Sequence, residues 1–328
     1  MTTPFPLFHL PRLALIPVFQ QMESVDVYVF LFLFFLFLIL NYYRIAVSLL
    51  SKKANNVSKI FRKLSSCSVH LTVESDHVYI CVEFGIWRKK VLKYYFNTES
   101  APQSVNSMTR KRRFTHKNSG LSAFKWVERV LDVTNCKSIG QLDLKGSPQV
   151  DVCDTTFDKL QNIRKLYIFK ECSDSFAKKA LEIVSPVTRE IILFKIPFET
   201  RDEFQTFLKN NLNYLNVHTN TFPNFKFTLE DLMVSNALKL KLNNGKLNVK
   251  EINQYFKNWM ENKCDPRLEH LELSTYDRKR AFHYSKQLDT SLQSFSGGYD
   301  IRRADRKKAT ITFGDVWGET FIDFYAWP

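Results

Sequence analysis

One short hydrophobic pattern recurs six times between residues 142 and 273: an apolar residue, any residue, then a second apolar residue. Each copy alternates as a β-strand does, and in most cases polar residues and a helix-like spacing of apolar residues follow it. A unit of this length cannot bury its apolar side alone, so neighbouring units are expected to stack around one continuous core. The six pairs are Leu142 and Leu144, Leu166 and Ile168, Ile192 and Phe194, Leu215 and Val217, Leu240 and Leu242, and Leu271 and Leu273.

The strand-then-helix order predicts an α/β fold, with the repeats forming a curved domain that resembles leucine-rich-repeat geometry. This domain is expected to occupy residues 120–328. Residues 308–313 and 320–327 have the alternation of antiparallel strands that would close it. Such stacked units favour an extended protein-binding surface over a catalytic pocket.

Residues 68–119 are expected to form a strand hairpin followed by a polar linking loop over residues 97–119. The apolar spacing of residues 124–131 then predicts an amphipathic helix. Farther along, two helix starts carry a capping-box pattern, in which a polar residue precedes a glutamate by three positions. These two pairs are Thr200 with Glu203 and Asn248 with Glu251.

The residues between the apolar pairs are expected to share the other face of the sheet, because side chains alternate along a strand. This row mixes acidic, basic, amide, aromatic and aliphatic side chains, which suits a folded protein surface better than a polyanion. Tyr167, Leu193, Asn216 and Lys241 are therefore the predicted substrate contacts, and Leu193 is the predicted hot spot. The full row is Asp143, Tyr167, Leu193, Asn216, Lys241 and Glu272.

An uncharged, strongly apolar run spans residues 27–43, rich in Phe, Leu, Val and Tyr. It is at the short end of what crosses a bilayer, and the Lys and Arg residues after it would leave the C-terminal body in the cytosol. A retained intron competes with this interpretation. Removing residues 28–44 keeps the reading frame and joins Val27 to Ile45 within one helical pattern. The protein is then expected in the cytoplasm, the nucleus or both.

Charge and composition exclude several functions. The formal net charge is +14, but the basic residues are spread along the chain and no nucleic-acid reader motif accompanies them. Six cysteines without a C-x-x-C pair fit neither a zinc module nor a dense disulfide framework. The sequence also lacks the glycine-rich phosphate loops and the nucleophile elbow. We therefore expect a non-enzyme that needs neither metal nor cofactor and does not bind nucleic acid.

Two parts of the chain resemble known modules. Residues Phe5–Met22, continued by Ser48–Ala54, resemble an F-box. The C-terminal half is similar to the F-box-associated type 2 domain of the nematode F-box family. The segments that carry this similarity are Leu229–Leu232, Leu247–Asn253, Phe256–Trp259, Pro266–Leu271, Gly298–Asp305 and Lys308–Ile311.

This resemblance implies a substrate-recruiting adaptor of a Skp–cullin–F-box ubiquitin ligase. Residues 5–66 would be the F-box, interrupted by the apolar run, and would bind the Skp-type subunit and through it the cullin. The C-terminal domain would bind an unknown target protein. A single-pass membrane protein with a cytosolic protein-binding domain is the alternative. By position, the Skp-binding residues would be Leu10, Pro11, Leu13, Val18, Met22 and Leu49.

Overall fold

The chain divides into two units, residues 1–63 and residues 64–328. The computed structural model describes residues in the second unit only. The described ranges are 67–84, 89–97, 104–108, 113–117, 123–148, 157–218, 226–243, 247–264, 267–275, 293–295, 298–316 and 319–327.

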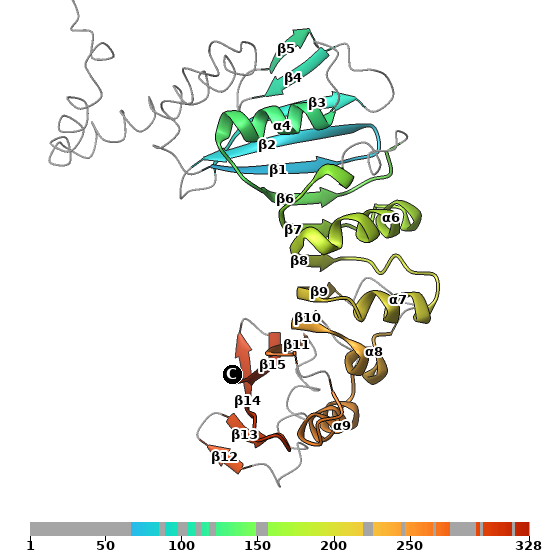
Figure 1. Ribbon diagram of the computed structural model, residues 1–328, viewed down its shortest axis with the longest axis vertical. Helices are drawn as coiled ribbons and strands as arrows, with labels where there is room; N and C mark the ends of the chain where they lie inside the picture. Colours follow the sequence, from blue (N-terminus) through green and yellow to red (C-terminus); the bar gives the residue numbers. More distant parts are fainter. Residues whose placement is uncertain are drawn as a thin grey trace, which may run out of the picture. The chain divides into compact units, whose positions relative to one another are not determined.

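The described strands join into one mixed sheet (Figure 1). Across the sheet they run in the order β12-β13-β14-β15-β11-β10-β9-β8-β7-β6-β1-β2-β3-β4-β5. On the N-terminal side these are β1 (Cys67–Val73), β2 (His77–Phe84), β3 (Lys89–Asn97), β4 (Ser104–Met108) and β5 (Arg113–Lys117). The middle holds β6 (Ile139–Leu144), β7 (Ile163–Ile168), β8 (Thr188–Leu193), β9 (Leu212–His218), β10 (Ala237–Asn243) and β11 (His270–Thr275). The C-terminal side holds β12 (Gln293–Phe295), β13 (Gly298–Arg302), β14 (Lys308–Val316) and β15 (Glu319–Ala326).

The recurring apolar pattern becomes the parallel middle of the sheet. Strands β6 to β11 lie side by side in sequence order, each parallel to the next. Their apolar residues meet in register, so that one buried row crosses all of these strands. That row is Leu142, Leu166, Ile191, Leu215, Leu240 and Leu271, each at most 1% exposed.

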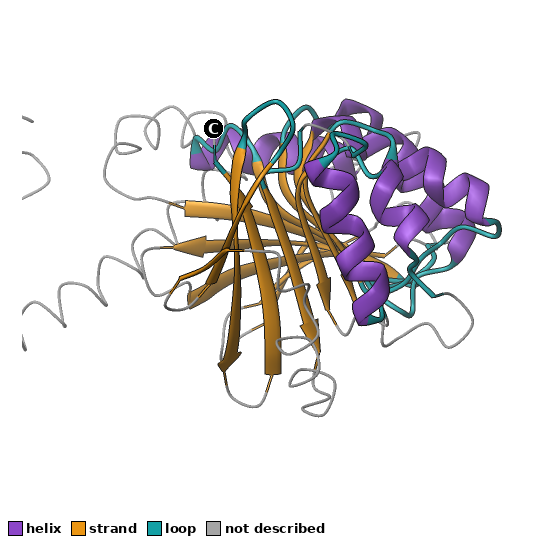
Figure 2. Cartoon of the chain, turned by 90° about the horizontal axis from the view of Figure 1, so that it is seen from below, coloured by secondary structure: helices purple, strands orange, loops and turns teal. Residues whose placement is uncertain are grey.

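Helices connect most of the parallel strands and lie over one face of the sheet (Figure 2). The aromatic contacts of α9 identify that face. Trp259 lies 5.1 Å from the ring of Phe324, which pairs with Leu271 across β15 and β11. The buried row therefore points toward the helices. These helices are α6 (Asp174–Val184), α7 (Arg201–Leu208), α8 (Leu229–Val234) and α9 (Val249–Met260).

The N-terminal strands belong to the same sheet as the repeats, because β1 pairs parallel to β6. The predicted hairpin is confirmed as β1 and β2, and the predicted helix over residues 124–131 is confirmed within α4 (Ala123–Thr134). The polar loop expected over residues 97–119 was wrong. Strands β4 and β5 lie there and pair with each other, because cross-strand backbone bonds can form without an apolar alternation.

The closing strands were predicted correctly, as β14 and β15 pair antiparallel and β15 pairs with β11. The mixed α/β class is thus confirmed, whereas the likeness to leucine-rich repeats stays a prediction. Helix starts also follow the sequence. The Thr200 hydroxyl accepts from the Glu203 backbone N–H at 3.2 Å, and Asn248 with Glu251 forms a reciprocal capping box. A further capping box, Thr228 with Asp231 at α8, was not predicted from the sequence.

Candidate protein-binding face of the sheet

The face of the parallel strands that points away from the buried row is called the outer face here. Its middle row crosses the strands in register and ends, at β15, on Asp323. Of the predicted contacts, Tyr167, Asn216 and Lys241 lie in this row. The row on the parallel strands is Asp143, Tyr167, Ile192, Asn216, Lys241 and Glu272.

Leu193 was placed on the wrong face by the sequence analysis. It is 0% exposed and pairs with Ile168 and Val217 in the core, whereas Ile192 pairs with Tyr167 and Asn216. The reason is local. Strand β8 ends on three consecutive apolar residues, so a two-residue period can start at either of two positions, and only pairing with β7 and β9 decides between them.

A second row of the outer face lies two residues after the middle row on each parallel strand and is called the aromatic row. Its members are Lys145, Phe169, Phe194, His218, Asn243 and Ser274. The rings of Phe169 and Phe194 stack at 5.1 Å with an interplanar angle of 16°, and Phe194 stacks on His218 at 4.3 Å. Lys145 Nζ lies 5.3 Å from the centroid of the Phe169 ring. The rings are therefore nearly parallel to one another. Aromatic side chains of this kind are enriched at surfaces that bind other proteins.

Hydrogen bonds extend the aromatic row across the last parallel strands. Asn243 Nδ2 lies 3.0 Å from His218 Nε2 and donates to Asn216 Oδ1 at 2.8 Å. Ser274 Oγ donates to Asn243 Oδ1 at 3.1 Å. Because Asn243 is 7% exposed and bonds to three residues on the two neighbouring strands β9 and β11, the row is held as one network.

A third row of the outer face lies two residues before the middle row and includes Lys165, Glu190 and Tyr214. Ion pairs form within this row and within the middle row. Lys165 Nζ lies 2.8 Å from Glu190 Oε2, and Lys241 in the middle row forms an ion pair with Glu272. Burial raises the pKa of Tyr214 to about 12, and the nearby carboxylates of Glu272 and Glu190 act in the same direction. Tyr214 is therefore a neutral hydroxyl at physiological pH. Lys165 and Lys241 are thus paired with glutamates, whereas Lys239, beside Tyr214 in this row, is exposed.

The outer face ends on two exposed aromatic residues, one in β15 and one directly after it. Tyr325 is 43% exposed and stacks on His270 at 4.2 Å with an angle of 9°. Trp327, two residues on and 55% exposed, donates from Nε1 to Thr310 Oγ1 at 3.0 Å. Tyr and Trp are over-represented among the residues that dominate binding energy at interfaces.

One cluster on this face has the side chains of a metal site. His270, Glu272 and Asp323 bring their ligand atoms within 4.8 Å of one another, and His270 Nε2 lies 3.2 Å from Asp323 Oδ1. The Lys241 ammonium is already paired with the Glu272 carboxylate. A cation there would have to compete with this internal positive charge, so the cluster is better suited to orienting side chains than to holding a metal.

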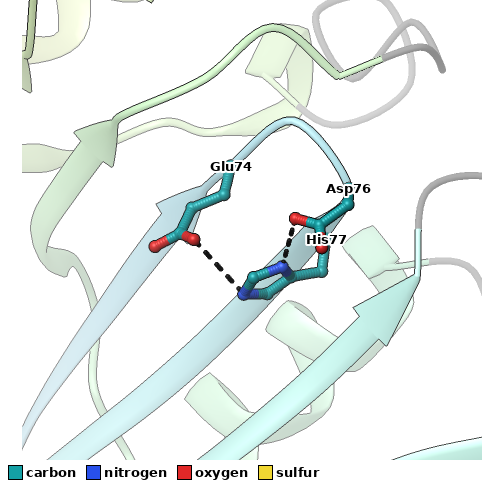
Figure 3. Close-up of side chains that lie close together, drawn as sticks. All are labelled: Glu74, Asp76 and His77. Carbon is teal, nitrogen blue, oxygen red and sulfur yellow. Dashed lines mark hydrogen bonds and ion pairs between the residues drawn. The ribbon is translucent and has the colours of Figure 1, made fainter. Parts of the chain in front are cut away.

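A second cluster sits at the turn between β1 and β2 (Figure 3). His77 Nδ1 lies 2.6 Å from Asp76 Oδ1, and His77 Nε2 lies 3.5 Å from Glu74 Oε2. The hydrogen bond to His77 holds the pKa of Asp76 below its usual value. Since each ring nitrogen of His77 faces a carboxylate oxygen, the three side chains already partner one another without a metal, and the cluster stabilises the turn.

The predicted Skp-binding residues and the apolar run at residues 27–43 lie outside the described residues. Among the residues that the structure does describe, none of the helices combines the length and apolar character that a bilayer crossing requires. The Skp-binding set remains a prediction for Leu10, Pro11, Leu13, Val18, Met22 and Leu49.

The aromatic row was not predicted from the sequence. Five of its residues come immediately after the second apolar residue of a pair, and a search of that position finds them without a structure: Lys145, Phe169, His218, Asn243 and Ser274. The sixth, Phe194, was expected in the core as the second apolar residue of its own pair, because the period of β8 was assigned one residue out of register.

Comparison with known proteins points to one family. Residues 203–273 match the family model described as F-box associated, a stretch that runs from α7 to β11 and includes Asn216, Lys241 and Glu272. Along almost its whole length the chain is similar to a Caenorhabditis elegans protein, "F-box associated domain-containing protein sdz-33". The two are 20% identical over 334 residues, which cover 98% of this chain and 97% of the relative. No solved structure matches the chain. The resemblance stated from the sequence is confirmed: residues 203–273 are similar to F-box associated domains, and the chain along its length is similar to a nematode protein that carries such a domain.

Proposed function

We propose that this chain recruits a target protein to a Skp–cullin–F-box ubiquitin ligase, with its outer face as the target-binding surface. The observation that carries the proposal is the position of the family match. It covers β9, β10 and β11, the strands that contribute Asn216, Lys241 and Glu272 to that face.

In this proposal residues 5–66 form the F-box and bind the Skp-type subunit, which in turn binds the cullin. Leu10 and Pro11 are the first anchors, followed by Leu13, Val18, Met22 and Leu49. An adaptor needs no catalytic side chain of its own. It acts by raising the effective concentration of the target near the enzyme that transfers ubiquitin.

Three properties of the outer face support a folded protein as the target. Lys165 and Lys241 are paired with glutamates within the face, which breaks the continuous cationic track that nucleic acid would need. Its aromatic row is stacked and therefore loses little side-chain entropy on binding. The exposed rings of Tyr325 and Trp327 supply side chains of the type that anchors interfaces.

The Skp-binding half of the proposal is tested with the full-length chain and purified Skp-type and cullin subunits. Replacing Leu10 and Pro11 together by Ala should abolish co-purification of both subunits, since apolar anchors at interfaces often contribute about 2 kcal/mol or more each. Tyr167→Asp, on the outer face, is the matched control and should leave this binding unchanged. Retained binding in the Leu10 and Pro11 variant would contradict the assignment.

The target-binding half is tested by site-specific photo-crosslinking in cells. A photoreactive amino acid at Asn216, on the outer face, should capture one or a few proteins whose ubiquitination falls when Leu10 and Pro11 are replaced. The matched control carries the same amino acid at Glu182, which is exposed on α6. Equal capture at both positions, or capture of proteins whose ubiquitination does not change, would reject the outer face as the recruiting surface.

The apolar run at residues 27–43 supports a second candidate function, a single-pass membrane protein with a cytosolic protein-binding domain. Two measurements separate the candidates: the transcript sequence across residues 27–44, and extraction of the protein from membranes with alkaline carbonate. A message that joins Val27 to Ile45 and a protein released by carbonate would favour the adaptor in the cytoplasm or nucleus. An unspliced message and carbonate-resistant protein would favour the membrane protein.

A further inference from the structure

Two cysteines that are far apart in the sequence meet at the N-terminal end of the sheet. Cys67 begins β1 and Cys136 follows α4, yet their Sγ atoms are 3.1 Å apart. Each thiol also lies near a backbone carbonyl of the other segment: Cys67 Sγ is 3.3 Å from the Thr134 oxygen, and Cys136 Sγ is 3.3 Å from the Cys67 oxygen. The juxtaposition is therefore part of the packing of these two segments.

Helix α4 holds this arrangement in place. It contacts β1, and its buried side includes Trp126, Val127 and Val130, each no more than 4% exposed. The two sulfur atoms are thus carried by a packed helix end and a strand start. Both cysteines are only partly buried.

The pair suits thiol chemistry better than metal binding. In the described part of the chain, the clusters able to hold a metal are at Glu74, Asp76 and His77 and at His270, Glu272 and Asp323. Neither contains Cys67 or Cys136. Among the described residues, the two thiols therefore fall short of the four ligands that zinc takes in structural sites.

We propose that Cys67 and Cys136 form a reversible disulfide, with a low-molecular-weight disulfide such as oxidised glutathione as the oxidant. A disulfide needs a sulfur–sulfur distance of about 2.05 Å, so closing the bond requires a movement of about 1 Å. Disulfides in cytosolic proteins are usually transient or redox-sensing, which is the behaviour expected of a pair that lies together as thiols.

The reaction has two exchange steps. The Cys136 thiolate attacks one sulfur of oxidised glutathione, forms a mixed disulfide and releases one glutathione thiolate, which takes up a proton. Cys67 then loses its proton to water and attacks the Cys136 sulfur, which releases the second glutathione. Two protein thiols are oxidised to one disulfide, and one glutathione disulfide is reduced to two thiols.

The order of attack follows from the local environment. The hydrogen bond from Cys67 lowers the pKa of Cys136 to about 7 against the opposing effect of burial. A substantial fraction of Cys136 is then thiolate at neutral pH, and the thiolate is the nucleophile in exchange. Cys136 is accordingly the attacking residue and Cys67 the resolving residue.

The bond would join β1 to the segment that follows α4. Its first cysteine, Cys67, comes directly after the predicted F-box residues 5–66 in the sequence. It does not depend on which protein, if any, the outer face binds. The proposal therefore stands or falls separately from the adaptor function.

The experiment equilibrates the full-length folded chain in glutathione buffers of increasing oxidised-to-reduced ratio, followed by acid quenching and alkylation of the remaining thiols. Mass spectrometry then maps the linked peptides. Cleavage after Glu74 separates Cys67 from Cys81. We expect a Cys67–Cys136 link that disappears when excess reduced glutathione is restored. Cys67→Ser and Cys136→Ser should each lose the link, whereas Cys264→Ser should retain it.

Cys67→Ser has a second expected result: Cys136 should accumulate as a glutathione mixed disulfide, since its resolving partner is missing. This readout remains informative even where circular dichroism shows a less stable variant. The proposal would be overturned if the wild-type chain, shown to be folded by circular dichroism, gave only glutathione adducts. Links through a different cysteine would overturn it as well.

Discussion

Replacing Leu193 by Ala should strongly destabilise the sheet domain. Leu193 is 0% exposed and lies between Ile168 and Val217 in the parallel core. Truncation removes buried methyl groups and leaves a cavity in the middle of a sheet that strands on both sides hold in place. For Leu to Ala at such positions the measured range is about 2–5 kcal/mol, and the fully enclosed site places the expected loss at about 3 kcal/mol.

The neighbouring Phe194 is the matched comparison, because the strand period inferred from the sequence alone assigns it to the core instead. In the structure Phe194 is half-buried on the outer face, stacked between Phe169 and His218. Phe194→Ala should lose these ring contacts and some buried apolar surface, which should lower the free energy of unfolding by about 1.5 kcal/mol. The larger side chain is thus expected to give the smaller effect.

Urea unfolding of the full-length chain, followed by fluorescence of buried residues such as Trp126 and Trp259, measures both changes. Leu193→Met, which nearly conserves volume, should cost less than about 1.5 kcal/mol and controls for general sensitivity of the site. If Phe194→Ala proves more destabilising than Leu193→Ala, then β8 is paired one residue out of the register described here, and the composition of both outer-face rows is wrong.

Three further predictions concern single interactions. Asp231→Ala should lower the free energy of unfolding in urea by about 2 kcal/mol, because the buried carboxylate no longer accepts from the Thr228 backbone N–H and from Arg201, although the Thr228 hydroxyl can still cap α8. Equal stability of variant and wild type would contradict this. The hydrogen bond from Arg303 lowers the pKa of Asp305 to about 2, below the ordinary 3.8. Its stabilisation is therefore present above about pH 4 and lost as pH falls toward 2, so Asp305→Asn should lower the melting temperature at pH 6 but not at pH 2. A melting-temperature difference that persists at pH 2 would argue against the ion pair. Gly314→Ala should lower the melting temperature, because its Cβ would clash with the ring of the cross-strand phenylalanine, and an unchanged value would show that the ring moves aside.

The sequence by itself determined the repeated parallel strands and the helices between them. Apolar pairs such as Leu166 and Ile168 recur with a strand period, and Thr200 and Asn248 mark helix starts, because alternation and capping are properties of short segments. It also placed Tyr167, Asn216 and Lys241 on one face. In each of these strands one polar or aromatic residue stands between two apolar ones, so only one orientation buries the apolar pair.

The tertiary structure decided what local patterns leave undetermined. Ile191, Ile192 and Leu193 are all apolar, so hydrophobicity is satisfied in either register and only the hydrogen bonds to β7 and β9 select one. Strands β4 and β5 depend on partners rather than on an apolar face of their own. The contact between Cys67 and Cys136 joins segments 69 residues apart, and no short-range pattern encodes such a distance. The residues that share a face follow from spacing along the chain, whereas those that touch across it follow from how the strands and helices pair.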